Sequence, residues 1–384
     1  MKKALSLLLA ALLLMPLASL SALAEERENE ENPLGITAQS AVLMEASTGK
    51  ILYAHNENEA LPPASVTKVM TLLLVMEAIG CGSLDWEDAV TVSAHAASMG
   101  GSQIYLKEGE TMTVKDLVKS VVIASANDAA VALAEHIAGS EEAFVSAMNE
   151  RALSLGLTGT HFENTNGLDD TVENHTCSAR DIAVMSRELI RYPEILAFSS
   201  TWMDTVRDGA FTLTNTNRLV RFYPGATGLK TGSTAKAGFC ISATAERDGV
   251  SLIAVIMNAE SRDTRNAEAK KLLDYGFSHY AVYRDTNEAL SSVAVRGGCL
   301  ESVAVRASAV SFAVPKDALS RVERRLVLPD SLYAPIAAGE TVGRVEYYLD
   351  GEKLGETPVC AEEQVAPVTF IYVLRRLLAA FCLS

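Results

Sequence analysis

Residues 62–72 read Pro-Pro-Ala-Ser-Val-Thr-Lys-Val-Met-Thr-Leu, and the rest of the chain can be understood from this stretch. The two prolines end whatever structure precedes them, and Pro63 suits the first position of a helix, where its missing N–H costs nothing. From Ser65 onward, apolar residues recur at helical spacing, which predicts a helix reaching about Ile79. Ser65 and Lys68 are three residues apart, so they share one face of that helix near its positive end.

A serine and a lysine in this arrangement can form a nucleophile and its base. The free N–H groups of a helix start favour negative charge, and a neutral amine can take the proton of a nearby hydroxyl. Lys68 can do so if burial or a second cation lowers its pKa. Ser-x-x-Lys alone is weak, because it recurs at 47–50 in a turn and at 233–236 in a strand-like segment. The alternative for Ser65 is a capping serine near a surface lysine.

The chain has 384 residues, enough for two or three domains. Residues 1–24 have the charged start, the apolar run and the small-residue cleavage site of a secretory signal peptide, and the run is too short for a membrane span. Loss of Lys2 and Lys3 with this signal takes the net charge from −15 to −17, which argues against nucleic acid as a partner. Residues 25–35 are expected to be a solvated acidic leader.

The cysteines and histidines predict neither a metal site nor a cofactor. There is no Cys-x-x-Cys pair and no His-Glu-x-x-His pattern. Export permits disulfides, but cysteines this sparse are more often buried thiols. If one pair forms, Cys299 with Cys360 is the pair we expect, because both lie in the same C-terminal segment.

The order of strands and helices predicts an α/β fold of the α+β kind. Strands at both ends of the first 285 residues enclose a mostly helical insertion at about 94–200. The simplest packing is one antiparallel sheet, built from both ends and flanked by helices. The predicted strands are 38–45, 51–55, 229–233, 238–246 and 250–258, and a helix is predicted at 262–280.

Composition divides the exported chain into three parts. Residues 36–285 form the predicted catalytic domain, and 286–366, rich in Val and Gly with short strands, form a small β domain. Residues 367–384 are predicted to be an amphipathic helix that lies on a membrane surface, because Arg375 and Arg376 interrupt an apolar run too short for a span. The alternative is a helix packed on the β domain.

Three short motifs stand in order along the chain. Ser65-Val66-Thr67-Lys68 is followed by Ser125-Ala126-Asn127 in a predicted interhelix loop, and then by Lys230-Thr231-Gly232 at a predicted strand edge. This trio is the pattern of serine β-lactamases and penicillin-binding proteins. It is far more specific than any one of its members.

With this trio, the chain resembles the D-alanyl-D-alanine carboxypeptidases, which are low-molecular-weight penicillin-binding proteins. The resemblance covers nearly all of the chain after the signal and implies the β domain and membrane-binding helix already expected. Ala126 departs from it, since the family usually has glycine there, and a modest effect is expected. Other stretches that carry the resemblance are 47–53, 164–168, 175–181, 334–336 and 339–343.

The resemblance implies a role for each catalytic residue. Ser65 attacks the carbonyl of the penultimate D-alanine, and Lys68, kept neutral by neighbouring cations, is the base. Ser125 relays a proton towards the leaving D-alanine. The backbone N–H groups of Ser65 and Ser233 form the oxyanion hole.

It also implies the substrate-binding residues. Asn127 hydrogen-bonds the substrate amide. Lys230 supplies positive potential that attracts the substrate carboxylate and helps to keep Lys68 neutral. Arg265 lies near the terminal carboxylate, although alone it could be a surface residue at a helix start. The strand on which the substrate docks contributes Thr231, Gly232 and Ser233.

The function implied is removal of the terminal D-alanine from peptidoglycan stem peptides that end in D-Ala-D-Ala, with β-lactams acylating Ser65. The location implied is the outer face of the cytoplasmic membrane, on the cell-wall side.

A serine β-lactamase shares the trio, but the chain lacks a Glu-x-x-Leu-Asn element after Ser125, and Glu163 has the wrong spacing. A non-catalytic penicillin- or wall-binding module should have lost part of the trio, and all of it is present. His175 is expected to form structural hydrogen bonds and not to act as a catalyst, because the Ser–Lys pair needs no histidine.

Overall fold

The computed structural model describes residues 32–170, 172–288 and 290–382. The predicted signal peptide, residues 1–24, and most of the predicted acidic leader lie outside the described residues. The chain divides into two compact units, with the boundary between Ser278 and His279.

A five-stranded sheet in the order β2-β1-β9-β8-β7 forms the centre of the first unit. All of its neighbouring strands are antiparallel. The two N-terminal strands form a hairpin at one edge, and the later strands complete the sheet, as the sequence predicted. The strands are β1 (Ser40–Glu45), β2 (Ile51–His55), β7 (Ala226–Thr234), β8 (Gly238–Arg247) and β9 (Val250–Ala259).

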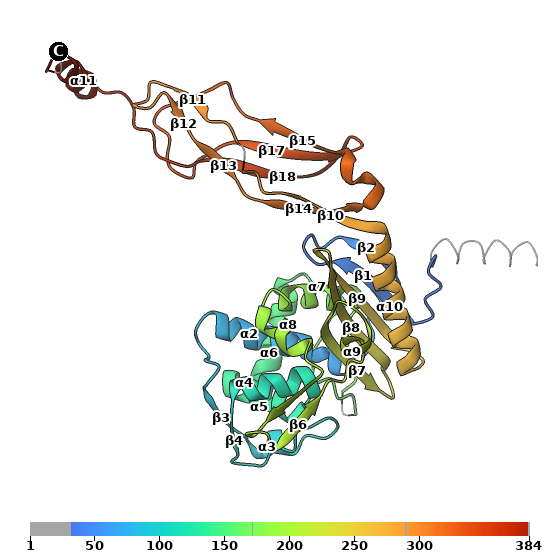
Figure 1. Cartoon of the computed structure of the whole chain (residues 1–384). Coiled ribbons are helices and arrows are strands. Elements are labelled where there is room, and N and C mark those ends of the chain that lie inside the picture. Colours follow the sequence, from blue (N-terminus) through green and yellow to red (C-terminus); the bar gives the residue numbers. More distant parts are fainter. Residues whose placement is uncertain (1–31, 171, 289, 383–384) are drawn as a thin grey trace, which may run out of the picture. The chain divides into compact units, whose positions relative to one another are not determined.

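Helices cover both faces of this sheet (Figure 1). The long helix α10 (Arg262–His279) lies on one face, where Gly276 packs directly against Leu43 and Leu252. The helical insertion covers the other face, where α7 (Ala179–Leu189) contacts β1 and β9. Because both faces are covered, β8 and β9 are buried along most of their lengths.

The helical insertion also contains two small strand pairs, β3 with β4 and β5 with β6. The buried side chains of the helices, the short strands and one face of the sheet form one apolar core. The helices are α2 (Lys68–Gly80), α3 (Ala94–Ala97), α4 (Val114–Lys119), α5 (Asn127–Ala138), α6 (Glu141–Ser154), α8 (Pro193–Ser199) and α9 (Leu219–Phe222), and the short strands are β3 (Ala89–Thr91), β4 (Thr111–Thr113), β5 (Met203–Val206) and β6 (Phe211–Thr214).

The second unit is a β domain with its own apolar core, in which Val345, Tyr347 and Val359 are almost fully buried. Its strands form three small sheets, in the orders β10-β14, β12-β11-β16 and β13-β18-β17-β15. The strands are β10 (Tyr280–Asp285), β11 (Val293–Arg296), β12 (Ser302–Val303), β13 (Val305–Ala307), β14 (Val310–Pro315), β15 (Val322–Val327), β16 (Ser331–Tyr333), β17 (Thr341–Leu349) and β18 (Glu352–Ala361).

The boundary between the units differs from the position read from the sequence, which was 285/286. Strand β10 pairs with β14 along its whole length, so it belongs to the β domain. The expected disulfide is also absent from the described residues, since Cys299 and Cys360 are free thiols. Cys299 Sγ instead lies 3.5 Å from the carbonyl oxygen of Pro367.

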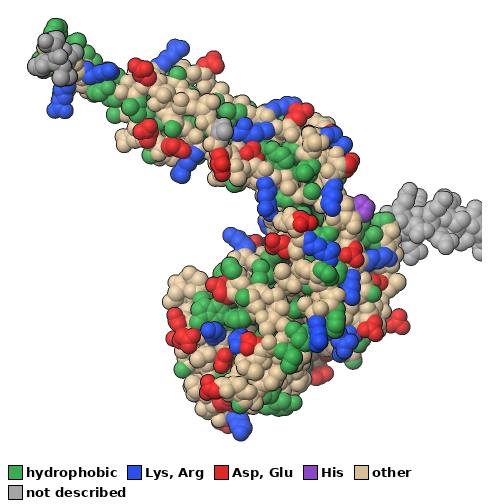
Figure 2. Space-filling model, viewed as in Figure 1, with side chains coloured by type: hydrophobic (Ala, Val, Ile, Leu, Met, Phe, Trp, Pro, Cys, Tyr) green, Lys and Arg blue, Asp and Glu red, His purple; other side chains and the backbone are tan. Residues whose placement is uncertain are grey.

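Helix α11 (Phe370–Cys382) follows the β domain. The hydroxyl of Tyr372 donates to the carbonyl oxygen of Cys299 at 2.9 Å, yet most of the helix is exposed. Figure 2 shows green apolar side chains together with blue arginines at this end of the chain. None of the described helices is long and apolar enough to cross a membrane.

Candidate active site

Ser65 lies in a tight turn immediately before α2. Ala64–Thr67 form a 3₁₀ turn, and the α-helix begins only at Lys68, so the predicted helix start is a turn joined to a helix. Ala64 has φ +47°, a left-handed value that is uncommon for a residue with a side chain. Such strain persists only where the surroundings hold it, and it is often found next to functional groups.

The amine of Lys68 is fully buried and reaches three oxygens. Its Nζ lies 2.6 Å from Asn127 Oδ1, 2.8 Å from the carbonyl oxygen of Asn166 and 2.9 Å from Ser65 Oγ. Two of these acceptors, the amide and the carbonyl, can only receive a hydrogen. A neutral amine has two hydrogens and one lone pair, so donation to these two oxygens leaves the lone pair for the hydroxyl hydrogen of Ser65.

Burial favours the neutral form of this amine. Removal from water, and secondly the positive charge of Lys230, hold the pKa of Lys68 well below its ordinary value, while Asp128 acts weakly in the other direction. The Asp128 carboxylate is itself occupied, because it accepts the backbone N–H groups of Ile104 and Leu106 at about 3 Å. The lowered pKa of Lys68 favours the neutral amine that a base requires.

A second lysine–serine pair faces the first. Lys230 Nζ donates to Ser125 Oγ at 2.7 Å and to the carbonyl oxygen of Thr231 at 3.0 Å. Ser125 sits between a π-helical turn and α5 with φ +63°, which points it out of the helix. Burial, with help from Arg265, lowers the pKa of Lys230 to about 7.

Asn127 begins α5, and both ends of its side chain are used within the protein. Its Oδ1 accepts from Lys68, and its Nδ2 donates to the carbonyl oxygen of Gly100 at 2.7 Å. Ala126 precedes it in an ordinary extended conformation, φ −60° and ψ 119°, so an alanine at this position needs no strained backbone. Asn127 thus orients Lys68 here, and it does not line the cavity described below.

The edge strand β7 forms one wall of the site. Thr231 Oγ1 donates to Thr216 Oγ1 at 2.8 Å, and Ser233 is exposed at the edge. Gly232 lies against the nucleophile turn, where a Cβ would come within 2.7 Å of the Ser65 backbone nitrogen. Glycine is therefore required for β7 to approach Ser65 this closely.

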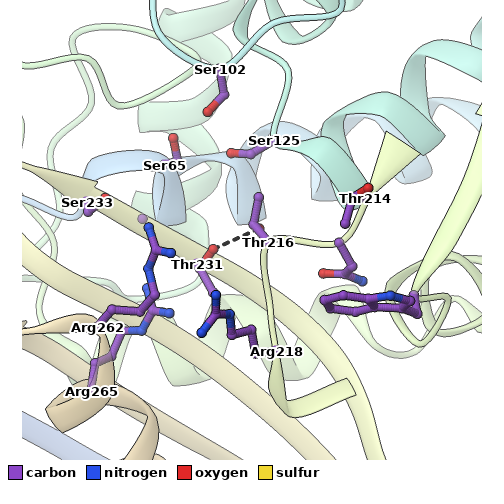
Figure 3. Close-up of a pocket in the computed structure, with 13 residues that line it drawn as sticks. Ser65, Ser102, Ser125, Thr214, Thr216, Arg218, Thr231, Ser233, Arg262 and Arg265 are labelled. Carbon is purple, nitrogen blue, oxygen red and sulfur yellow. Dashed lines mark hydrogen bonds between the residues drawn. The ribbon is translucent and has the colours of Figure 1, made fainter. Parts of the chain in front are cut away.

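These elements surround a cavity of about 460 Å³. Figure 3 shows Ser65 and Ser125 above Thr231, with the three arginines below. The predicted residues Ser65, Ser125, Thr231, Gly232, Ser233 and Arg265 line the cavity, whereas Lys68, Asn127 and Lys230 lie behind its surface. Lining residues that the sequence did not indicate are Ser102, Trp202, Thr214, Asn215, Thr216, Arg218 and Arg262.

Arg265 lies on α10 and is buried at the cavity wall. Its Nε and Nη2 donate to Asn266 Oδ1, and its Nη1 lies 3.4 Å from the carbonyl oxygen of Cys240. Burial, and secondly the charge of Arg262, lower its pKa to about 10, so it remains charged at neutral pH. Arg265 pairs with no carboxylate among the described residues, and a buried guanidinium of this kind is suited to receive the carboxylate of a ligand.

The turn at 164–168 contacts residues on both sides of Ser65. The sequence indicated this turn only through the family resemblance. Besides the carbonyl of Asn166 on Lys68, this turn contributes Gly167, which has φ +83°. A Cβ on Gly167 would lie 1.9 Å from the carbonyl oxygen of Ala64, so only glycine permits this contact. The turn therefore packs against the strained residue that precedes Ser65.

Taken together, the fold and the site define a class. An antiparallel sheet flanked by helices presents a helix-start Ser–Lys pair, a loop serine and a Lys-Thr-Gly edge strand around one cavity. That is the arrangement of serine acyltransferases that recognise penicillin.

Comparison with known proteins identifies the family. The chain belongs to the D-alanyl-D-alanine carboxypeptidase family, whose sequence model matches residues 26–261, and residues 277–367 match the C-terminal domain of penicillin-binding protein 5. It is 43% identical to D-alanyl-D-alanine carboxypeptidase DacF of Bacillus subtilis over 98% of both chains.

Solved structures agree. Penicillin-binding protein 5 from Haemophilus influenzae superposes with a TM-score of 0.75 at 34% identity, covering 86% of this chain and 98% of its own. Penicillin-binding protein D2 from Listeria monocytogenes, in its ampicillin-bound form, has a TM-score of 0.58 at 32% identity and covers 63% of this chain and 98% of its own.

Proposed function

We propose that this chain is a serine-type D-Ala-D-Ala carboxypeptidase that removes the terminal D-alanine of peptidoglycan stem peptides through an acyl-enzyme on Ser65. One observation supports the nucleophile above all others. Lys68 Nζ lies within hydrogen-bond distance of Asn127 Oδ1, the carbonyl oxygen of Asn166 and, at 2.9 Å, Ser65 Oγ. In the neutral amine, donation to the first two oxygens leaves the lone pair to accept the hydroxyl hydrogen of Ser65. A base in this position activates the hydroxyl without a histidine.

In the first half of the reaction, Ser65 Oγ attacks the carbonyl carbon of the penultimate D-alanine and its proton passes to Lys68 Nζ. The C–N bond then breaks, and the proton held by Lys68 is passed on through Ser125, which is hydrogen-bonded to Lys230, to the leaving nitrogen of D-alanine, so that Lys68 is neutral again. An ester on Ser65 and free D-alanine result. Backbone N–H groups of Ser65 and Ser233 are suited to stabilise the oxyanion.

In the second half, a water molecule attacks the ester carbon and gives a proton to Lys68. Ser65 Oγ leaves and recovers that proton, so the enzyme returns to its starting state and the shortened peptide is released. The terminal carboxylate of the substrate binds to Arg265, Lys230 and Thr231, which lie beyond Ser65 in the cavity. A β-lactam, which carries an amide and a carboxylate at similar positions, enters the first half and forms an ester on the same serine.

The test is the identity of the acylated residue. Benzylpenicillin added to the protein should add its own mass, and digestion should place the adduct on Ser65. Label on Ser47 or Ser233, the serines of the other Ser-x-x-Lys patterns, would refute the assignment. Release of D-alanine from a pentapeptide ending in D-Ala-D-Ala, measured by mass spectrometry, separates a carboxypeptidase from a module that binds without turnover.

As a member of its family, the enzyme acts on the cell wall outside the cytoplasm. We further propose that it is held at the outer face of the cytoplasmic membrane by α11. The support is a helix whose large apolar side chains are exposed while Arg375 and Arg376 offer positive charge to anionic lipids. The exposed apolar side chains are Phe370, Ile371, Val373, Leu374, Leu377, Leu378 and Phe381.

A further inference from the structure

A second groove lies beside the active site. Its volume is about 720 Å³, and it has no lining residue in common with the cavity around Ser65. One wall is the loop at 104–110, between α3 and β4, and the other is the tip of the β5–β6 hairpin, where Arg207, Ala210 and Phe211 lie. No step of the proposed reaction uses these residues, so the groove needs an explanation of its own.

An arginine ties the two walls of this groove together. Arg207 Nε and Nη2 donate to the two carboxylate oxygens of Glu110 at 2.6 and 3.2 Å, and Arg207 Nη1 donates to the carbonyl oxygen of Ile104 at 2.8 Å. The hydrogen bond from Arg207 is the main reason that the pKa of Glu110 lies below its ordinary value. A two-pronged contact between charged groups fixes both direction and distance. The walls are therefore held at a set separation before any ligand binds.

Two aromatic rings, one from each wall, line the groove. Tyr105 is 67% exposed, and its φ of +57° is a left-handed value that is uncommon for a residue with a bulky side chain. Its ring meets the ring of Phe211 edge to face, with the two centroids 6.3 Å apart. The guanidinium of Arg207 lies 5.5 Å from the centroid of Phe211. An exposed tyrosine beside a formed groove offers a ligand a large, rigid surface at a small entropic cost.

The charges of the groove indicate a ligand without net charge. Its two cations, Lys107 and Arg207, are matched by two acids, Glu108 and Glu110, and Arg207 is paired with Glu110. The cavity around Ser65 differs, because three arginines and no acid line it among the described residues. A neutral sugar suits the groove, since the C–H face of its ring packs on the electron-rich face of an aromatic side chain. Its hydroxyl and acetamido groups can bond to a fixed carboxylate and guanidinium.

The two walls of the groove continue directly into the active-site cavity. Ser102 and Thr214 line that cavity (Figure 3), and the same two segments line the groove from Ile104 and from Phe211. Three residues of a strand span about 10 Å, which is less than the length of about 13 Å that four extended residues reach. A polymer in the groove therefore keeps a short peptide attached to it near Ser65.

We propose that this groove binds a glycan strand of peptidoglycan, with one sugar ring stacked on Tyr105, at a site separate from the site of reaction. The choice of polymer rests on the proposed function, because stem peptides of peptidoglycan are the substrate proposed for Ser65. The paired Arg207 and Glu110 then hold the groove open and offer hydrogen bonds to the sugar. The groove adds affinity for the wall, and it takes no part in the acylation of Ser65.

The test measures sugar binding directly. The probe is the tetramer of N-acetylglucosamine, which has pyranose rings and acetamido groups and no charge, titrated into the protein without residues 1–24 and followed by calorimetry. We expect Tyr105→Ala to weaken binding at least tenfold, and Tyr105→Phe, which keeps the ring, to weaken it less than threefold. Tyr333→Ala is the matched control, because Tyr333 is 71% exposed and lies in the β domain. It should bind the tetramer as the unaltered protein does.

Two further measurements separate the groove from the active site. Prior acylation by benzylpenicillin should leave the affinity for the tetramer unchanged, and Tyr105→Ala should release D-alanine from a free pentapeptide at the original rate. No binding of the tetramer, equal binding by Tyr105→Ala, an equal loss in Tyr333→Ala, or competition by benzylpenicillin would overturn the glycan site and leave the carboxypeptidase assignment standing. If the tetramer binds while benzylpenicillin forms no adduct and no D-alanine is released, the proposed function itself fails.

Discussion

His175 Nε2 lies 2.7 Å from Thr67 Oγ1, and this contact joins a distant loop to the nucleophile turn. His175 Nδ1 accepts the backbone N–H of Glu163 at 3.0 Å, so in the neutral ring Nε2 carries the hydrogen and donates it to Thr67. Thr67 then donates to the carbonyl oxygen of Ala64 at 2.8 Å. The chain of bonds ends on the strained residue before Ser65. A hydrogen-bonding role for His175 was expected, but its link to Ser65 was not.

We expect Thr67→Val to slow acylation and Thr67→Ser to preserve it. Valine has the shape of threonine but leaves the hydrogen of His175 and the carbonyl of Ala64 without partners, a cost of about 1–3 kcal/mol. The second-order rate constant for acylation by benzylpenicillin should fall about tenfold in the valine variant and less than threefold in the serine variant. A valine variant that melts at a lower temperature yet acylates at the original rate would show that the contact stabilises the fold only.

Lys68→Ala should abolish acylation while the protein stays folded. Loss of a general base costs about 10²–10⁴-fold in rate, and no other amine reaches Ser65 Oγ among the contacts described. Lys236→Ala is the control, because Lys236 ends another Ser-x-x-Lys pattern but is exposed and bonded to the carbonyl oxygen of Asp169. Acylation of both variants by benzylpenicillin is followed by mass spectrometry, with folding checked by circular dichroism. Near-normal acylation without Lys68 would mean that another group is the base.

Acylation should have an alkaline limb near pH 7. The reaction needs Lys68 neutral, which a higher pH favours, and Lys230 charged, which a higher pH opposes. Because burial lowers the pKa of Lys230 to about 7, its charge is lost as pH rises through that value. The acylation rate constant for benzylpenicillin, measured from pH 5 to 10, should therefore rise and then fall. Lys230→Arg should move the falling limb to higher pH, since a guanidinium keeps its proton. A rate that still rises at pH 9 in the unaltered enzyme would contradict the need for charge.

The fold was predictable where local signals are long or sharply bounded. The turn at 47–50 between two alternating runs predicted the β1–β2 hairpin, and 247–249 predicted the β8–β9 hairpin. The strand pairs β3–β4 and β5–β6 were missed because strands of three or four residues are too short for a period of two to register. The domain boundary was placed late because β10 continues directly from α10 without a linker.

The site was predictable only as far as its motifs extend. Each motif marks residues a few positions apart, so Ser65, Ser125 and Lys230 stand out in the sequence. Thr216 and Arg262 belong to no motif. Thr216 follows β6 and lies at the cavity because it pairs with Thr231 of β7, and Arg262 lines the cavity from the first position of α10. Pairings of that kind depend on contacts between segments far apart in the sequence, which no local pattern encodes.

Deleting residues 368–384 should free the protein from membranes and leave its activity on a soluble peptide. Helix α11 exposes its large apolar side chains, and Arg375 and Arg376 each contribute about 1 kcal/mol near an anionic surface. Full-length and truncated proteins, both without residues 1–24, are compared by flotation with vesicles of anionic or zwitterionic lipid, and then by D-alanine release. We expect only the full-length form to float, and more of it with anionic lipid. Arg375→Gln with Arg376→Gln should remove that lipid preference while part of the binding remains. A truncated form that still floats would place the membrane contact elsewhere, and loss of activity in solution would make the tail part of the catalytic structure.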